Sequence, residues 1–137
     1  MERRVGYQLK RAQHALRGGM DEVLREIGMT TAQYAALSAL EAEAGLSGAD
    51  LARRSFVTPQ TMNQILTRLE RDGMISRRAH PRHGRVLRTD LSKEGRRKLA
   101  EAHKLVEEVE AKMLKNFDDA EIRQLSDALR RCAESLE

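Results

Sequence analysis

Apolar residues recur at intervals of three and four over most of the chain, which is the spacing of one face of an α-helix. The first such run covers residues 2–27, and its apolar members are Val5, Leu9, Ala12, Leu16, Met20, Val23, Leu24 and Ile27. Gly18 and Gly19 interrupt the run, and they indicate a close helix contact, a bend or simple tolerance of glycine. Later runs follow Ser92 and Asp118. The pattern therefore predicts long amphipathic helices near both ends of the chain.

Capping residues divide the region after the first helix into shorter elements. Gly28 ends the first helix, and Thr30 with Gln33 three residues later has the form of a capping box that opens a second helix. Gly45 ends this second helix. Ser47 is a suitable N-cap for a short third helix, GADLARR. The spacing thus predicts two helices in this part of the chain.

A three-residue break separates the third helix from a fourth, which is the best-defined element in the sequence. Thr58 is a good N-cap, Pro59 fits the first helical position, and Gly73 lies where a helix ends. The apolar stripe of this helix is Met62, Ile65, Leu66 and Leu69. Two short β-compatible runs then flank a turn built on Pro81 and Gly84, which predicts a β-hairpin.

The predicted fold class is mainly α with a small β-hairpin, in a single domain of residues 1–137. Two prolines and two phenylalanines in 137 residues suit such a helical chain better than a β-sandwich. Asp118 with Glu121 forms a capping box for the last helix, whose apolar stripe is Ile122, Leu125, Leu129, Cys132 and Leu136. We expect Cys132, the single cysteine, to be a packed small residue on that stripe, with no internal disulfide.

Several classes of function are disfavoured by what the sequence lacks. No apolar run approaches the ~20 residues that span a bilayer, and the N-terminus lacks a signal-peptide core, so we expect a cytoplasmic protein with no membrane partner. No phosphate-binding loop, nucleophile motif or clustered carboxylate pair indicates an enzyme. His80 and His83 form an H-x-x-H pair, but the surrounding arginines disfavour a dication. We therefore predict no metal and no cofactor.

The positive charge of the chain is concentrated in its middle. The formal net charge is +4, but residues 52–98 contain thirteen Lys or Arg against four Asp or Glu, a net of +9. The rest of the chain therefore carries a net of −5. Such local basicity predicts a face that binds a polyanion.

A short helix, a tight break and a capped helix form the pattern of a helix-turn-helix, whose second helix reads base edges in the major groove of DNA. The candidate reading residues at the start of that helix are Thr58, Gln60, Thr61, Asn63 and Gln64, and Arg68 lies further along it. Asn and Gln amides pair bidentately with adenine, and threonine offers a hydroxyl or a methyl group. The same residues also fit the plain solvated face of an amphipathic helix.

The predicted hairpin decides between these interpretations. Within twelve residues it carries five arginines and two histidines but no acid, namely Arg77, Arg78, His80, Arg82, His83, Arg85 and Arg88. Ordinary surfaces mix charges of both signs, whereas a wing that contacts phosphates or the minor groove needs cations. We therefore predict duplex DNA as a partner, with Arg78, Arg82, His83 and Arg85 as contacts. RNA binding and a winged helix that makes only protein contacts are the alternatives.

The order of these elements, and especially VTPQTMNQILTRLERDGMISRR followed by HPRHGR and LSKEG, closely resembles the MarR family of winged helix-turn-helix regulators. The resemblance covers essentially the whole chain, and residues 46–95 are its most specific part. It implies a homodimer, with dimerisation helices at 2–27 and 93–137 and a DNA-binding lobe at 30–91. It also implies a transcription regulator, usually a repressor, that binds a pseudo-palindromic operator and is released by a small aromatic or phenolic ligand.

The dimer is also expected from the residues themselves, because the terminal helices carry apolar stripes that one chain of this size can hardly cover. By position in the family, Arg11, His14 and Tyr34 are candidate contacts for an acidic aromatic effector. Tyr34 also fits a role in the core, and Arg11 also fits an ion pair. The wing departs from the Asp-x-Arg pattern of the family, because His83 takes the place of the acid before Gly84 and Arg85. Arg85 is still predicted to contact DNA, without the acid that would orient it.

Overall fold

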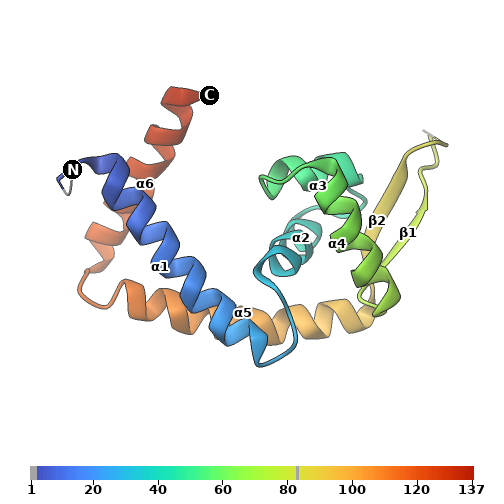
Figure 1. The fold of residues 1–137 in the computed structure, drawn as a ribbon, viewed down its shortest axis with the longest axis horizontal. Helices are drawn as coiled ribbons and strands as arrows, with labels where there is room; N and C mark the ends of the chain where they lie inside the picture. The colour runs from blue at the N-terminus through green and yellow to red at the C-terminus, as the bar shows by residue number, and fades with distance from the viewer. Residues whose placement is uncertain (1–2, 83) are drawn as a thin grey trace.

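The structure is a computed structural model, which describes residues 3–82 and 84–137. Its elements are α1 (Val5–Arg25), α2 (Thr31–Ala42), α3 (Gly48–Arg54), α4 (Pro59–Arg71), β1 (Ile75–Ala79), β2 (Leu87–Leu91), α5 (Lys93–Met113) and α6 (Asp119–Leu136). Figure 1 shows two parts joined by α5. We call residues 30–91 the lobe, and α1, α6 and the C-terminal half of α5 the arm. The predicted fold class, mainly helical with one hairpin, is confirmed.

Helix ends follow the predicted capping chemistry. The Thr30 hydroxyl accepts a hydrogen bond from the Gln33 backbone N–H, and the Gln33 side chain accepts one from the Thr30 N–H, so the predicted capping box is present. Asp118 and Glu121 form the second predicted box. Ser47 forms a box with Asp50 that the sequence reading did not include. These contacts satisfy backbone donors that have no partner inside the helix.

The core of the molecule lies in the lobe and in the half of α5 beneath it. Leucine and methionine side chains from α2, α3, α4 and α5 are fully buried there, namely Leu37, Leu51, Met62, Leu66 and Leu99. Three of the four residues in the predicted α4 stripe are buried, and Ile65 packs against them partly buried. The recognition helix is therefore held on one face by apolar packing, which leaves its other face to solvent.

The hairpin is antiparallel, and Arg78 pairs with Arg88 in its register. The Thr89 N–H donates to the Leu46 carbonyl, so the hairpin also joins the segment between α2 and α3. At its base, a Cβ on Gly95 would lie 2.0 Å from the Met74 carbonyl oxygen, so only glycine allows the start of α5 to pass this close to β1. β2 is thus joined to the segment before α3, and the residue before β1 packs against the start of α5.

The arm is packed less completely than the lobe. Gly19 faces Val109 of α5, whose Cγ1 would lie 3.0 Å from an added Cβ, whereas Gly18 has nothing within 4 Å. The close-contact interpretation therefore holds for Gly19 alone. No residue of α6 is buried, and Cys132 is exposed, so its predicted packing is wrong for the single chain. The reason is that the apolar stripe of α6 meets no covering element of the same chain.

Two smaller differences concern the terminal helices. The first helix begins at Val5 and ends at Arg25, inside the predicted range. Met113 was expected to belong to the apolar run that follows Ser92 and to face inward, but in α5 it is 42% exposed. In the described part of the chain, no helix combines the length and the apolar character needed to cross a membrane.

Candidate nucleic-acid interface

The turn between α3 and α4 sets the direction of the predicted recognition helix. Ser55 ends α3, Phe56 has a positive φ of 58°, and Thr58 is the N-cap of α4. The side chain of Phe56 is 95% exposed. An L-residue rarely adopts this left-handed conformation, and here it redirects the chain within three residues. The short break predicted from the sequence is therefore a true helix-turn-helix corner.

The predicted base-reading residues lie on the exposed side of α4, and one of them, Thr58, also caps the helix. The exposed residues are Thr58, Gln60, Thr61, Asn63, Gln64 and Arg68. The Thr58 hydroxyl accepts from the Thr61 N–H at 3.1 Å and donates to the Thr61 hydroxyl at 3.0 Å, so this side chain first serves to cap the helix. Gln60, Gln64 and Arg68 are spaced by four and share one face of α4. That face carries hydrogen-bond donors and acceptors without an acidic residue between them.

Arg77, which the sequence reading counted among the wing cations, turns toward α4 instead. Its side chain is only 14% exposed, and Nη2 lies 3.0 Å from a carboxylate oxygen of Glu70. Nη1 donates to the Asn63 side-chain oxygen at 3.1 Å, and Nη2 donates to the Thr67 hydroxyl at 3.3 Å. Arg77 is therefore paired with an acid on α4 and is not one of the exposed cations of the wing.

Arg88 is also removed from the predicted set of free cations. Its Nε and Nη2 each donate to a carboxylate oxygen of Asp90 at 2.9 Å. This bidentate contact lowers the pKa of Asp90, and the same hydrogen bonds raise the pKa of Arg88. Arg78 lies 3.6 Å from Asp90 with its side chain 71% exposed. The hairpin is thus not of one sign at its base, where Asp90 balances Arg88.

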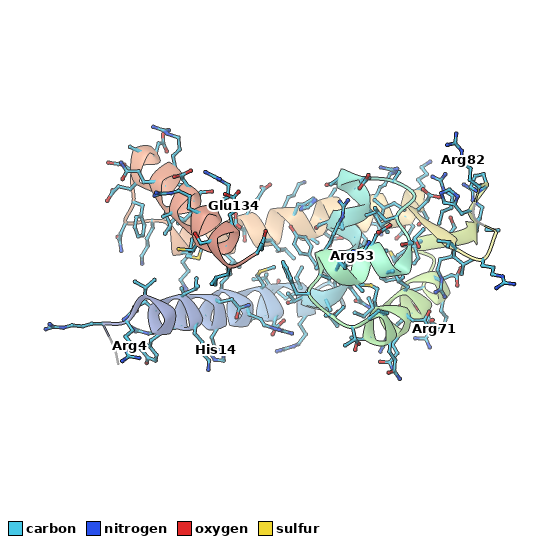
Figure 2. The ribbon with its side chains drawn as sticks, turned by 90° about the horizontal axis from the view of Figure 1, so that it is seen from above. Arg4, His14, Arg53, Arg71, Arg82 and Glu134 are labelled. Atoms are coloured by element: carbon cyan, nitrogen blue, oxygen red, sulfur yellow. The ribbon has the colours of Figure 1, made fainter. Side chains whose placement is uncertain are left out.

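The exposed cations of the wing are Arg78, Arg82 and Arg85. Figure 2 shows Arg82 at the tip of the hairpin, at the opposite end of the molecule from Arg4. Arg82 and Arg85 form no ion pair with any residue in the described ranges 3–82 and 84–137. His83, the remaining predicted contact, lies outside the described residues. The wing therefore presents three arginines to a partner, fewer than the sequence indicated.

The predicted effector residues are not assembled into one site. The Tyr34 hydroxyl lies 2.7 Å from Nδ1 of His103, whose Nε2 lies 2.8 Å from a carboxylate oxygen of Glu41. Burial raises the pKa of Tyr34, so its hydroxyl stays protonated near neutral pH. Arg11 and His14 are exposed on α1, and His14 projects away from α5 and α6 (Figure 2). None of the interactions of Tyr34 involves either residue.

Candidate metal ligands are not clustered either. Among the described residues, no group of three or more His, Cys, Asp or Glu side chains is placed to hold a metal ion.

Sequence reasoning missed the contacts of Arg77 with α4 and of Arg88 with Asp90. The spacing of Arg88 and Asp90 was an available signal, because alternate residues of a strand share one face. The partners of Arg77 had no such local signal.

A helix-turn-helix followed by a hairpin with exposed arginines defines a winged helix-turn-helix protein that binds DNA. Sequence comparison supports the same class. Residues 27–86 match the model of the MarR family. The HTH-type transcriptional repressor Rv2887 of Mycobacterium tuberculosis is 33% identical over 127 residues, which cover 93% of this chain and 91% of the relative. The chain therefore belongs to the MarR family, as its sequence predicted, and it is a DNA-binding transcription regulator.

Solved structures extend the likeness over the whole fold. The transcriptional repressor CouR, bound to a 23-mer DNA duplex, has a TM-score of 0.88 and 26% identity, covering 96% of this chain and 94% of its own. Rv2887 in complex with p-aminosalicylic acid has a TM-score of 0.79 and 31% identity, covering 95% and 98%. Rv2887 in complex with DNA has a TM-score of 0.78 and 29% identity, covering 94% and 97%. Proteins of the MarR family are typically not enzymes.

Proposed function

We propose that the protein is a homodimeric repressor that binds a pseudo-palindromic operator in duplex DNA. The observation that carries this proposal is the lobe itself, in which the exposed polar face of α4 and the exposed arginines of the wing belong to one packed unit. A helix supplies contacts to base edges, and cations supply contacts to phosphates. The structures of CouR bound to a DNA duplex and of Rv2887 in complex with DNA support the same role.

The second copy of the chain is proposed to cover the arm. A hollow of about 670 Å³ lies between α1, α5 and α6, and its lining includes Leu9, Leu16, Phe117, Leu125 and Leu129. MarR-family proteins act as dimers, and an apolar surface of this kind is typical of an interface. Two-fold symmetry would place two recognition helices about 34 Å apart, which is one turn of DNA. Dimerisation is therefore assigned to residues 2–27 and 93–137, and DNA binding to 30–91.

The contacts follow from exposure. We assign base reading to Gln60, Thr61, Asn63 and Gln64, together with Thr58 and Arg68 at the edges of the set. We assign phosphate or minor-groove contacts to Arg78, Arg82 and Arg85, and to His83 by its position in the sequence. The protein is then a cytoplasmic regulator without catalytic activity of its own.

A small aromatic acid is proposed as the effector. Support comes from the relative Rv2887, whose structure was determined in complex with p-aminosalicylic acid. In this chain Tyr34, Arg11 and His14 stay the candidate contacts, and Tyr34 must exchange its hydrogen bond with His103 to reach a ligand. A titration of the operator complex with p-aminosalicylate, comparing the wild type with Tyr34→Phe, tests this assignment. We expect p-aminosalicylate to lower the operator affinity of the wild type and to have a smaller effect on Tyr34→Phe.

The main test is a selection of bound sequences from random duplex DNA, followed by titration of the enriched sequence at two salt concentrations. An inverted repeat bound by two chains, with affinity that falls steeply with salt, is the expected result. Enrichment of a single half-site bound by one chain would refute the dimer. No enrichment by the folded protein would refute operator binding and favour a role in protein contacts, and equal binding to duplex RNA would favour an RNA partner.

A further inference from the structure

Arg77 of β1 joins the wing to three side chains on one face of α4. Asn63, Thr67 and Glu70 are spaced by four and three along the helix, so they share this face. Arg77 donates to the Asn63 and Thr67 side-chain oxygens and to the Glu70 carboxylate. The Thr67 hydroxyl in turn donates to the Asn63 backbone carbonyl at 2.8 Å. The guanidinium is thus fixed by several partners and carries a charge that Glu70 balances.

The chemistry of this contact determines which way the Asn63 amide faces. A guanidinium has five N–H donors and no acceptor, so it selects the oxygen of an amide and never its NH₂ group. With Oδ1 held by Nη1 of Arg77 at 3.1 Å, the NH₂ group is directed away from Arg77. Asn63 is exposed on the proposed reading side of α4. Its outward end is therefore a donor.

We propose that Arg77 is a positioning residue that makes Asn63 a donor-only reader, and that Asn63 selects guanine in each half of the operator. Guanine presents two acceptors in the major groove, N7 and O6, whereas adenine presents one acceptor and one donor. Pairing with adenine needs the oxygen and the NH₂ group of the amide to face the base together, and the contact with Arg77 turns the oxygen toward β1. The adenine amino group would also face the Asn63 NH₂ group, donor against donor. This inference rests on the proposed operator binding.

The first experiment compares the wild type with Asn63→Ala in the selection from random duplex DNA. The base preference that disappears in Asn63→Ala identifies the position read by Asn63, and guanine is the expected base there. Changing that guanine to adenine in both half-sites should weaken wild-type binding about 5- to 100-fold per half-site and leave Asn63→Ala unaffected. Enrichment of any other base, or no difference between the two proteins, would overturn the proposal. Either result still leaves an enriched operator, whereas failure of the proposed function leaves none.

The second experiment tests the part played by Arg77. Arg77→Met frees the Asn63 oxygen, so the preference for guanine over adenine at that position should fall at least fivefold. The slope of affinity against salt should stay unchanged, because this guanidinium is paired with Glu70 and its side chain is only 14% exposed.

Arg78→Met is the matched control, since the neighbouring side chain is 71% exposed. Its loss should lower the salt slope and affect all sequences alike. An unchanged base preference in folded Arg77→Met, or a salt slope lowered as in Arg78→Met, would overturn the positioning role. If Arg77→Met does not fold, the wild-type and Asn63→Ala selections still decide whether Asn63 selects guanine, and any other base there overturns the proposal.

Discussion

The lobe and the arm are built from similar amphipathic helices, but they differ in how fully those helices are covered. In the lobe, Leu51 and Met62 are 0% exposed. In the arm, Leu125 and Leu129 are 38% and 43% exposed on a helix that has no buried residue. An apolar stripe is therefore buried within the chain only where another element of the same chain packs across it. The core of the lobe is closed by α5 and the end of α1 of the same chain, whereas the arm is left open for a second copy.

The largest effect is expected from a cavity in the core of the lobe. Leu51→Ala removes a fully buried side chain of α3 and should lower the free energy of unfolding by about 2–5 kcal/mol. Urea unfolding followed by circular dichroism measures this loss. A loss below about 1 kcal/mol would mean that the lobe core is looser than its burial indicates, and the contrast with the arm would weaken.

A charge in the open groove of the arm should act on assembly instead. Leu129→Glu places a carboxylate in the apolar lining of the groove, so the dimer should dissociate and operator affinity should fall more than tenfold. Sedimentation velocity and operator titration measure the two effects. Gln124→Glu, which adds the same charge at an exposed position of α6 outside that lining, is the control. A Leu129→Glu protein that stays dimeric would show that the interface lies elsewhere.

A change on the reading face of α4 should weaken operator binding and leave the dimer intact. Gln64→Ala removes an exposed amide without disturbing the core, so operator binding should weaken by roughly 1–3 kcal/mol while binding to random DNA changes little. The oligomeric state should not change. Equal losses on operator and random DNA would remove Gln64 from the set of base-reading residues.

A smaller effect separates the two kinds of wing arginine. Arg85→Ala should lower the slope of log affinity against log salt by about one unit, as expected for the loss of one phosphate contact. Arg88→Ala should leave that slope unchanged, because Arg88 is already paired with Asp90. Titrations at several salt concentrations compare them. Equal slopes for both variants would contradict the division of the wing into free and paired cations.

The smallest effect concerns acid. Because Arg88 lowers the pKa of Asp90 in the folded state, this pair stabilises the protein above the unfolded pKa of about 3.9 and loses its effect as pH falls through the lower folded pKa. The contribution should be small, because solvent screens a pair that lies this close to the surface. The urea midpoints of the wild type and Asp90→Asn should therefore differ at neutral pH and approach each other as the pH falls below 4. A constant difference would show that the pair adds no pH dependence.

Much of the fold was predictable because its signals are local. Thr30 with Gln33 and Asp118 with Glu121 cap helices through contacts three residues apart, so sequence spacing reveals them. The α4 stripe was equally visible, because helical periodicity places its members on one face. The need for glycine at position 95 was not visible, since it depends on how near the Met74 carbonyl passes.

The candidate site divides in the same way. The recognition helix, its exposed polar residues and the basic hairpin could all be predicted from the amino-acid sequence, because each depends on residues close together in the chain. Which arginines are free depends on the folded structure. Arg77 meets Glu70 and Asn63 only after β1 has folded against α4, and Cys132 stays exposed because no element of its own chain covers α6. Charged residues can be counted in a sequence, but which of them form ion pairs depends on their distances in the folded protein.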